Sequence, residues 1–315
     1  MTPSKIHERD IERVLSYVHP FISQHFDAQS SISTRRPFVL GLTGLQGSGK
    51  STWTEALVTT LQRIFNYNTI SLSLDDLYLD HDELVKLRTN NPFNQLLQAR
   101  GQPGTHDIAL SLGFFESLKI STGDILIPSF DKSMFNGEGG RAPQESWRRV
   151  PAGTRVDVVI FEGWCIGFQP LTDDFVQERW DKELETRTRT KYPTRTLKDH
   201  AIDHLLNVNN SLRRYCELFM GPQHLDYLIH LDTDDLVNVY EWRIQQERAL
   251  WQAKNQGMTD DEVVTFVKGY MPAYELYLGQ LRSGFFRPHE SCKGKGQLSV
   301  ILDKERMIVK MAEVP

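Results

Sequence analysis

A glycine-rich stretch with one lysine, GLTGLQGSGKSTW at residues 41–53, constrains the fold of this chain more than any other segment. It overlaps the end of the apolar run PFVLGLTG and is followed by STWTEALVTTLQRIF, whose apolar residues have helical spacing. From Gly44 to Ser51 it fits the pattern G-x-x-x-x-G-K-S. Glycines let consecutive backbone N–H groups turn toward an anion without a Cβ atom in the way. The stretch therefore predicts a phosphate-binding loop between a buried strand and a helix that begins at about Gly49.

The residues of this loop have complementary roles toward a nucleoside triphosphate. The N-terminus of the following helix offers free N–H groups and a positive dipole end, and Lys50 supplies a charge to the outer phosphates. Ser51 can hold Mg²⁺. The residues predicted to bind the nucleotide are Gly44, Leu45, Gln46, Gly47, Ser48, Gly49, Lys50, Ser51 and Thr52.

The order of the predicted elements is typical of a parallel α/β sheet. The segments NTISLSLDDLYL, DILIPSF, RVDVVIFEGW and LDYLIHLD have the composition of strands, and helical stretches lie between or after them. Repeated β and α units predict a mainly parallel sheet with helices on both faces, a three-layer α/β/α fold. Because no internal repeat or linker interrupts the pattern, we expect a single domain over residues 1–315.

Two segments are predicted to be additions to this core. Residues 1–36 are expected to form an N-terminal helical extension, because KIHERDIERVLSYVHPFISQHF has apolar residues near helical spacing, with an interruption near Pro20. Residues 172–203 are strongly charged and predict a solvated helix and loop inserted on the surface, with a basic docking patch as the alternative.

One pair of helix boundaries near the end of the chain is also readable. Gly257 is expected to stop one helix, and Thr259 is expected to cap the next, with Glu262 completing a capping box.

Composition excludes several classes of protein. The chain has 41 acidic and 36 basic residues, a net charge of -5, so it lacks the basic footprint of a nucleic-acid-binding protein. Its three cysteines, Cys165, Cys216 and Cys292, are too few and too far apart for a disulfide framework or a zinc motif, which fits a reducing compartment. No apolar run approaches the roughly 20 residues that span a bilayer. We therefore expect a cytoplasmic protein without a nucleic-acid or membrane partner.

Carboxylates that follow predicted strands are candidates for catalysis and metal binding. Asp75 and Asp76 end the second predicted strand, and ligands in open α/β sheets bind beyond the carboxyl ends of the strands. A carboxylate there can accept the proton of an attacking hydroxyl group, but the alternation of residues along the strand does not choose between the two aspartates. Glu162 closes the strand VDVVIFEG, where an acid can bind Mg²⁺ directly or through water. The structural alternatives are a helix cap for the aspartates and an exposed strand end for the glutamate.

Two loops, QARGQPGTHD and PSFDKSMFNGEGGRAP, are rich in glycine, proline and charged residues within a foldable domain. They are candidate walls of a site for a second substrate. Their residues that can bind a small polar anion are Arg100, His106, Asp107, Lys132 and Arg141, with solvated turn residues as the alternative.

Several motifs, in this order, resemble those of the D-glycerate 3-kinases of the plant and fungal type, relatives of uridine kinase, pantothenate kinase and phosphoribulokinase. The motifs are GLQGSGKST, LDDLYL, GQPGTHD, PSFDKSMFNGEGGR, VVIFEGW, VYEWRIQQE and GMTDDEVVTFVKGYMPAYELYL. The resemblance covers roughly residues 37–280, and it implies the P-loop NTPase kinase fold with a Walker A loop.

The resemblance also implies roles for individual residues. Asp75 falls where relatives keep the hydroxyl-activating carboxylate, which favours it over Asp76, and Glu162 falls on the magnesium-associated acid. Arg243 and Arg248 lie where uridine kinases have a helical lid with arginines that face the phosphates.

On the acceptor side, Thr105 of GQPGTHD joins the candidate substrate-binding residues. Gly140 departs from the family, because an acidic residue is expected before Arg141.

The predicted function is that of an ATP-dependent kinase that uses Mg²⁺ and transfers the γ-phosphate to a hydroxyl group, with Lys50 and Asp75 as catalytic residues. The resemblance implies a D-glycerate 3-kinase, whose partner is a small anionic hydroxy acid and whose product is 3-phosphoglycerate. The alternatives are a kinase for a nucleoside, pantothenate or a sugar phosphate, and a non-catalytic ATP-binding regulatory protein. A GTPase is disfavoured because no N-K-x-D-like guanine signature follows the loop. The oligomeric state stays open.

Overall fold

The centre of the molecule is a six-stranded sheet with the strand order β10-β9-β8-β1-β7-β2. The computed structural model describes residues 6–30, 35–119, 123–183, 190–255, 257–287, 292 and 294–314. Neighbouring strands run parallel except at one edge, where β10 is antiparallel to β9. The strands are β1 (Phe38–Gly44), β2 (Thr69–Ser73), β7 (Val158–Gly163), β8 (Tyr227–Asp232), β9 (Gly296–Leu302) and β10 (Ile308–Val314).

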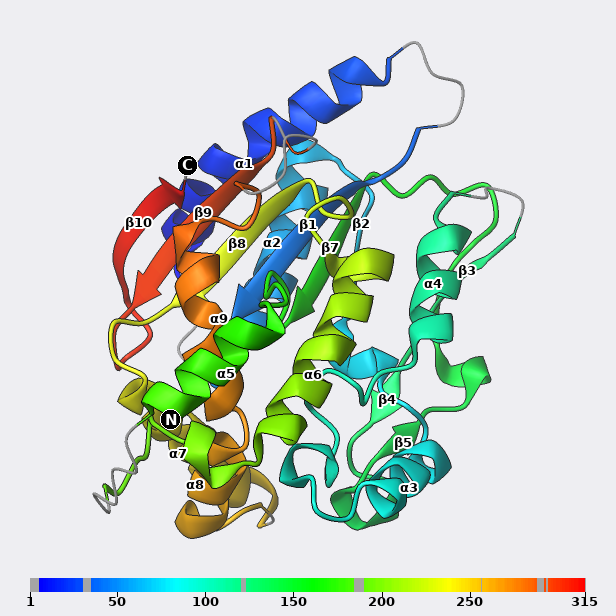
Figure 1. The fold of residues 1–315 in the computed structure, drawn as a ribbon. Coiled ribbons are helices and arrows are strands. Elements are labelled where there is room, and N and C mark those ends of the chain that lie inside the picture. The colour runs from blue at the N-terminus through cyan, green and yellow to red at the C-terminus, as the bar shows by residue number, and fades with distance from the viewer. Residues whose placement is uncertain are drawn as a thin grey trace.

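Helices cover both faces of this sheet (Figure 1). One face carries α1 (Glu8–Ala28) and α2 (Lys50–Phe65), and the other carries α5 (Asp173–Lys182), α6 (Ile202–Tyr215) and α9 (Met271–Ser283). Beyond the carboxyl ends of the parallel strands lie α3 (His81–Asn90), α7 (Val237–Lys254) and α8 (Asp260–Lys268). The predicted α/β/α architecture is confirmed.

A smaller layer lies beside β2. It contains α4 (Ile108–Ser117) and two short antiparallel pairs, β3 (Ile125–Ile127) with β6 (Arg148–Val150) and β4 (Phe130–Asp131) with β5 (Gly140–Arg141). The segment DILIPSF therefore does form a strand, but outside the parallel sheet. The prediction of the central strands is confirmed for β1, β2, β7 and β8, whereas β9 and β10 were not predicted.

The N-terminal helix contradicts one prediction. Instead of breaking near Pro20, α1 continues through it. Proline removes one backbone donor and strains one turn, but the helix packs against α2 and β9 along a continuous apolar face, which outweighs that loss. The buried residues of this face are Ile11, Val14, Leu15, Val18 and Ile22.

The charged segment 172–203 contains α5, and its residues 184–189 lie outside the described part of the chain. Although most of α5 faces solvent, Val176 is buried and Arg179 Nη2 donates a hydrogen bond of 2.8 Å to the carbonyl of Glu275 in α9. This helix is therefore attached to the core.

The predicted helix caps agree with the structure except at one position. Gly49 is the N-cap of α2, and Thr259 caps α8 in a complete capping box with Glu262. The preceding helix ends at Lys254 instead of at Gly257, because Asn255 already adopts the left-handed conformation that stops it. None of the helices in the described residues has the length and apolar character needed to cross a lipid bilayer.

Candidate active site

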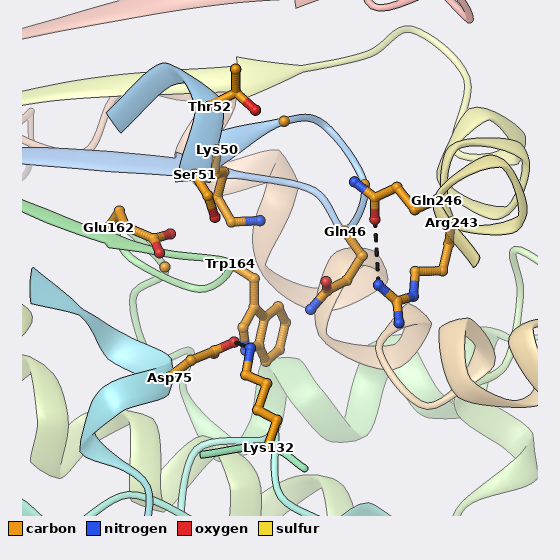
Figure 2. A pocket seen from close by; sticks show the side chains of 13 residues that line it. Gln46, Lys50, Ser51, Thr52, Asp75, Lys132, Glu162, Trp164, Arg243 and Gln246 are labelled. Atoms are coloured by element: carbon orange, nitrogen blue, oxygen red, sulfur yellow. Dashed lines mark hydrogen bonds and ion pairs between the residues drawn. The ribbon is translucent and has the colours of Figure 1, made fainter. Parts of the chain in front are cut away.

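A cavity of about 200 Å³ lies beyond the carboxyl ends of β1, β2 and β7. Figure 2 shows side chains from the phosphate-binding loop, the end of β7, the turn after β2 and helix α7 converging on it. The lining residues are Gln46, Gly47, Gly49, Lys50, Ser51, Thr52, Asp75, Lys132, Glu162, Gly163, Trp164, Arg243 and Gln246.

The backbone of the phosphate-binding loop requires glycine at two positions. Gly47 has φ +82° and Gly49 has φ +91°, in the region that side chains disfavour. At Gly47 there is also no space, because an added Cβ would lie 2.7 Å from Cβ of Trp242 in α7. The loop can therefore approach α7 and expose its backbone toward the cavity.

Lys50 is held by the loop that it follows. Its Nζ donates to the carbonyls of Gly44 at 2.9 Å and of Leu45 at 3.2 Å. Burial lowers the pKa of Lys50, and the nearby Glu162 carboxylate opposes that shift. Gly44, Leu45 and Ser48 were also predicted to bind the nucleotide, but they are buried and do not line the cavity. The hydroxyl of Ser48 has no hydrogen-bond partner.

The two adjacent aspartates point to different places. Strand β2 ends at Ser73, and both aspartates lie in a 3-10 turn, Leu74–Leu77, in which Ser73 Oγ accepts a hydrogen bond from the N–H of Asp75. Asp75 lines the cavity, whereas Asp76 Oδ1 accepts a hydrogen bond of 3.0 Å from the N–H of Phe130. The alternation of side chains along a strand could not show which aspartate faces the cavity, because the strand ends before Asp75 and Asp76.

The carboxylate of Asp75 has two partners. Lys132 forms an ion pair with Oδ2, and the hydroxyl of Tyr78 donates to Oδ1 at 2.9 Å (Figure 2 shows Lys132 reaching Asp75). Burial alone raises the pKa of Asp75, but Lys132 and Tyr78 together hold it below the ordinary value. Asp75 is therefore ionised at neutral pH and faces the loop that carries Lys50.

Ser51 and Glu162 offer oxygen atoms on the same side of the cavity (Figure 2). Burial raises the pKa of Glu162, and Lys50 and Ser73 oppose the shift. A hydroxyl and a carboxylate suit Mg²⁺, which prefers oxygen ligands. In the described residues there is no cluster of three or more His, Cys, Asp or Glu side chains that could hold a metal. Mg²⁺ at this place would thus depend on phosphate oxygens and water as well, as it commonly does.

The two arginines that were predicted to bind the acceptor, Arg100 and Arg141, have partners within the protein. Arg100 donates to the carbonyls of Gly137 at 2.8 Å and of Glu138 at 2.5 Å. Arg141 forms an ion pair of 2.7 Å with Asp107, which also caps α4. Both guanidinium groups therefore fix the loops to each other.

Thr105 and His106 lie behind the cavity wall. Thr105 is buried and donates to the carbonyl of Gln102 at 2.8 Å. The ring of His106 stacks on Tyr78 at 4.5 Å, and burial lowers the pKa of His106 to about 3, so the imidazole is neutral. Of the predicted acceptor-binding residues, Lys132 alone lines the cavity.

The departure at Gly140 has a steric explanation. An added Cβ would lie 2.7 Å from the ring of Phe135, which covers this position. A carboxylate near Arg141 comes from Glu138 instead, which forms an ion pair with Arg88 at 2.8 Å and lies within hydrogen-bond distance, 3.0 Å, of His81 Nε2.

The two predicted lid arginines differ. Arg243 lines the cavity, where it forms an ion pair with Glu247 and lies 5.0 Å from the ring of Phe266. Arg248 forms an ion pair with Asp260 and does not line the cavity.

Sequence reasoning missed two residues that line the cavity and one that contacts the phosphate-binding loop from outside it. Trp164 lines the cavity and donates to the carbonyl of Gly101 at 3.0 Å; its place directly after the strand end was the available signal. Gln246 lines the cavity one helical turn after Trp242. Arg306 donates to the carbonyl of Gly47 from a distant part of the chain, and no local motif marked it.

Comparison with known proteins identifies relatives of the whole chain. No protein-family model matches it. The chain is 41% identical over 278 residues to the uncharacterized kinase mug58 of Schizosaccharomyces pombe, a match that covers 88% of this chain and 91% of that protein. It is 31% identical to the probable ATP-dependent kinase TDA10 of Saccharomyces cerevisiae over 94% of each chain.

A solved structure extends this likeness to three dimensions. The D-glycerate 3-kinase from Cryptococcus neoformans var. grubii has a TM-score of 0.82 and 31% sequence identity, and the match covers 96% of this chain and 98% of that one. The chain therefore belongs to the D-glycerate 3-kinase family of P-loop kinases and is an ATP-dependent phosphotransferase that acts on an alcohol group.

Proposed function

We propose that the acceptor of this kinase is D-glycerate, which is phosphorylated on its 3-hydroxyl to give 3-phosphoglycerate, and that the reaction takes place in the cytoplasm. The observation that carries the proposal is the pair of Asp75 and Lys132 on the cavity. It offers a carboxylate to a hydroxyl group and an ammonium to an anionic group of the same small molecule. The name of the Cryptococcus relative, D-glycerate 3-kinase, supports this choice of acceptor.

On the nucleotide side, residues 44–52 would bind the phosphates of ATP through backbone N–H groups, and Lys50 would neutralise the outer phosphates. Arg243 is the second cation on the cavity that can reach this side. Ser51 and Glu162 would hold Mg²⁺, which supplies further neutralisation of phosphate charge when it is bound.

On the acceptor side, Asp75 would orient the attacking hydroxyl and receive its proton. The ionised state that Lys132 and Tyr78 maintain makes the carboxylate a proton acceptor at neutral pH. Because the hydroxyl of Tyr78 donates to Oδ1, the carboxylate is held in one orientation. Phosphoryl transfer depends mainly on positioning and charge stabilisation, so such an orientation contributes directly to the rate.

Lys132 would bind the carboxylate of the acceptor. Its side chain is 55% exposed and extends from the loop after β4 into the cavity, so it can contact an incoming anion. Arg100 and Arg141 would act indirectly, because they fix the loop that carries Lys132.

The proposal is tested by coupled ADP-release measurements with D-glycerate, glycerol, pantothenate, uridine and ribulose 5-phosphate. D-glycerate should give the highest kcat/KM. Glycerol, which lacks the carboxylate, should be poorer by about 10- to 100-fold, the effect of one charge-assisted hydrogen bond. Lys132→Met, measured at about pH 8 so that Asp75 stays ionised in the variant, should lower kcat/KM for D-glycerate by a similar factor and leave glycerol nearly unchanged.

Activity confined to uridine, pantothenate or the sugar phosphate would replace D-glycerate with that acceptor. If Lys132→Met lowers kcat/KM equally for D-glycerate and glycerol, Lys132 does not bind the carboxylate of the acceptor.

A further inference from the structure

Arg306 joins two parts of the nucleotide site from a distant place in the chain. It lies in the turn between β9 and β10, at the edge of the sheet opposite β2 (Figure 1). It belongs to none of the motifs that the sequence indicated, and it does not line the cavity. Its side chain nevertheless contacts the phosphate-binding loop and α7 at the same time.

The guanidinium group of Arg306 donates to three acceptors. Nε donates to the carbonyl of Gly47 at 2.7 Å, Nη2 to the carbonyl of Trp242 at 2.9 Å and Nη1 to Oε1 of Gln245 at 2.8 Å. A planar guanidinium has donors in a fixed fork, so three bonds of this kind fix the relative positions of their acceptors. An ammonium group in the same place would offer no such plane.

The bond to Gly47 connects Arg306 with Lys50. In a trans peptide the C=O and the following N–H point in opposite directions, so the bond at the Gly47 carbonyl also sets the direction of the N–H of Ser48. That N–H donates to the carbonyl of Leu45 at 3.2 Å, and the same carbonyl accepts a hydrogen bond from Lys50 Nζ. Three hydrogen bonds and the peptide group between Gly47 and Ser48 thus connect the turn with Lys50 on the cavity.

The bonds to α7 connect Arg306 with the neighbouring wall of the cavity. Arg243 and Gln246, next to the contacted Trp242 and Gln245, line the cavity where α7 packs against the loop at Gly47 (Figure 2). The indole N–H of Trp242 in turn donates to the carbonyl of Lys304 at 2.9 Å. Two side chains therefore attach α7 to the turn: Arg306 of the turn and Trp242 of the helix.

The turn itself is well fixed. Arg306 has φ +64°, a conformation that costs a non-glycine residue about 1 kcal/mol or more. The side chain of Asp303 compensates, because its Oδ1 accepts hydrogen bonds from the N–H groups of Glu305 at 2.9 Å and of Met307 at 2.8 Å. The backbone keeps this conformation and thereby aims the arginine at the loop.

We propose that Arg306 is a positioning residue for ATP, which holds the phosphate-binding loop and α7 at the separation that the nucleotide needs. The proposal goes beyond the choice of acceptor, because it concerns the nucleotide alone. It can be measured by ATP binding in the absence of any acceptor, so its failure and the failure of the D-glycerate proposal are distinguishable.

The test is the Kd of ATP for the full-length Arg306→Ala and Arg306→Lys variants, measured by titration calorimetry together with steady-state kinetics. Arg306→Ala should raise the Kd and the KM of ATP about tenfold or more, the effect of losing one or more hydrogen bonds from a charged group. The KM of the acceptor and kcat at saturating ATP should change less than about threefold. Arg306→Lys should restore little, whereas millimolar guanidinium should partly restore ATP binding to Arg306→Ala, because it supplies the missing planar group.

Lys310→Ala is the matched control. It removes one exposed cation from β10 and should leave the Kd of ATP unchanged. If Arg306→Ala does not fold, as thermal unfolding will reveal, the Kd of Arg306→Lys decides the question. An ATP Kd within about twofold of the native value in a folded variant overturns the proposal. So does a parallel loss of ATP binding, acceptor binding and kcat that guanidinium does not reverse.

Discussion

The nucleotide side and the acceptor side of the cavity are built in different ways. The proposed nucleotide side consists mainly of one continuous segment, residues 44–52, whose backbone N–H groups would bind the phosphates. The acceptor side is assembled from the turn after β2 and the loop after β4, and its function depends on side chains. A site formed by backbone N–H groups tolerates few substitutions, because its residues must keep unusual φ angles. A site formed by side chains can accept a different ligand after a single substitution.

The two sides also use their cations differently. Lys50 and Arg243 line the cavity on the nucleotide side, although both are held by neighbouring groups. On the acceptor side, Arg100 and Arg141 are used within the protein, and Lys132 lines the cavity. Acceptor choice should therefore depend on very few residues, while nucleotide binding should depend on the loop as a whole.

The largest expected effect is on the nucleotide side. Lys50→Met should lower kcat/KM for ATP by about 10³-fold, because the lysine stabilises phosphate charge in both the bound and the transition state. Both the Kd of ATP and kcat should worsen, which separate binding and steady-state measurements will show. Thermal unfolding provides the control for folding. A loss below about tenfold would contradict the role of Lys50.

The next effect belongs to the acceptor side. Asp75→Asn should leave the Kd of ATP near its native value while kcat falls by about 10²-fold or more, because an amide can accept the Tyr78 hydrogen bond but cannot accept a proton. Asp76→Asn is the matched control; it retains an acceptor for the N–H of Phe130 and should keep most of the activity. A kcat for Asp75→Asn within a few-fold of the native value would disprove the general-base role.

The smallest effect concerns the pH dependence. If Asp75 is the general base of the proposed reaction, kcat should fall as the pH drops through the pKa of Asp75, which Lys132 and Tyr78 hold below its ordinary value. Lys132→Met removes the positive charge and raises that pKa, so the acid limb of kcat should move upward by about one pH unit or more. Lys132→Arg retains a charge and should keep the limb near its native position. Profiles between about pH 4 and pH 7 that coincide for Lys132→Met and the native enzyme would contradict this coupling.

The two sides differed in how far sequence reasoning could predict them. Gly47, Gly49 and Lys50 could be placed at the cavity because a local pattern between one strand and one helix marks them. The same local signals predicted the central strands and the capping box at Thr259. Residues 296–314 were not predicted as β9 and β10; β9 pairs with β8, which lies far back in the chain, and β10 joins the sheet through β9.

The acceptor side could not be predicted to the same depth. Whether Arg141 binds a ligand or Asp107 depends on two loops meeting in space, which sequence spacing does not reveal. The separation of Asp75 from Asp76 depends on where β2 gives way to a 3-10 turn.

That short turn has one more consequence. Asp76 holds the N–H of Phe130, two residues before Lys132, and Asp75 holds the ammonium group of Lys132 itself. The adjacent residues Asp75 and Asp76 thus hold two points of the same loop, the side chain of Lys132 and the backbone at Phe130. A shift of this loop relative to the turn would therefore have to break the hydrogen bond between Asp76 and the backbone as well as the ion pair between Asp75 and Lys132.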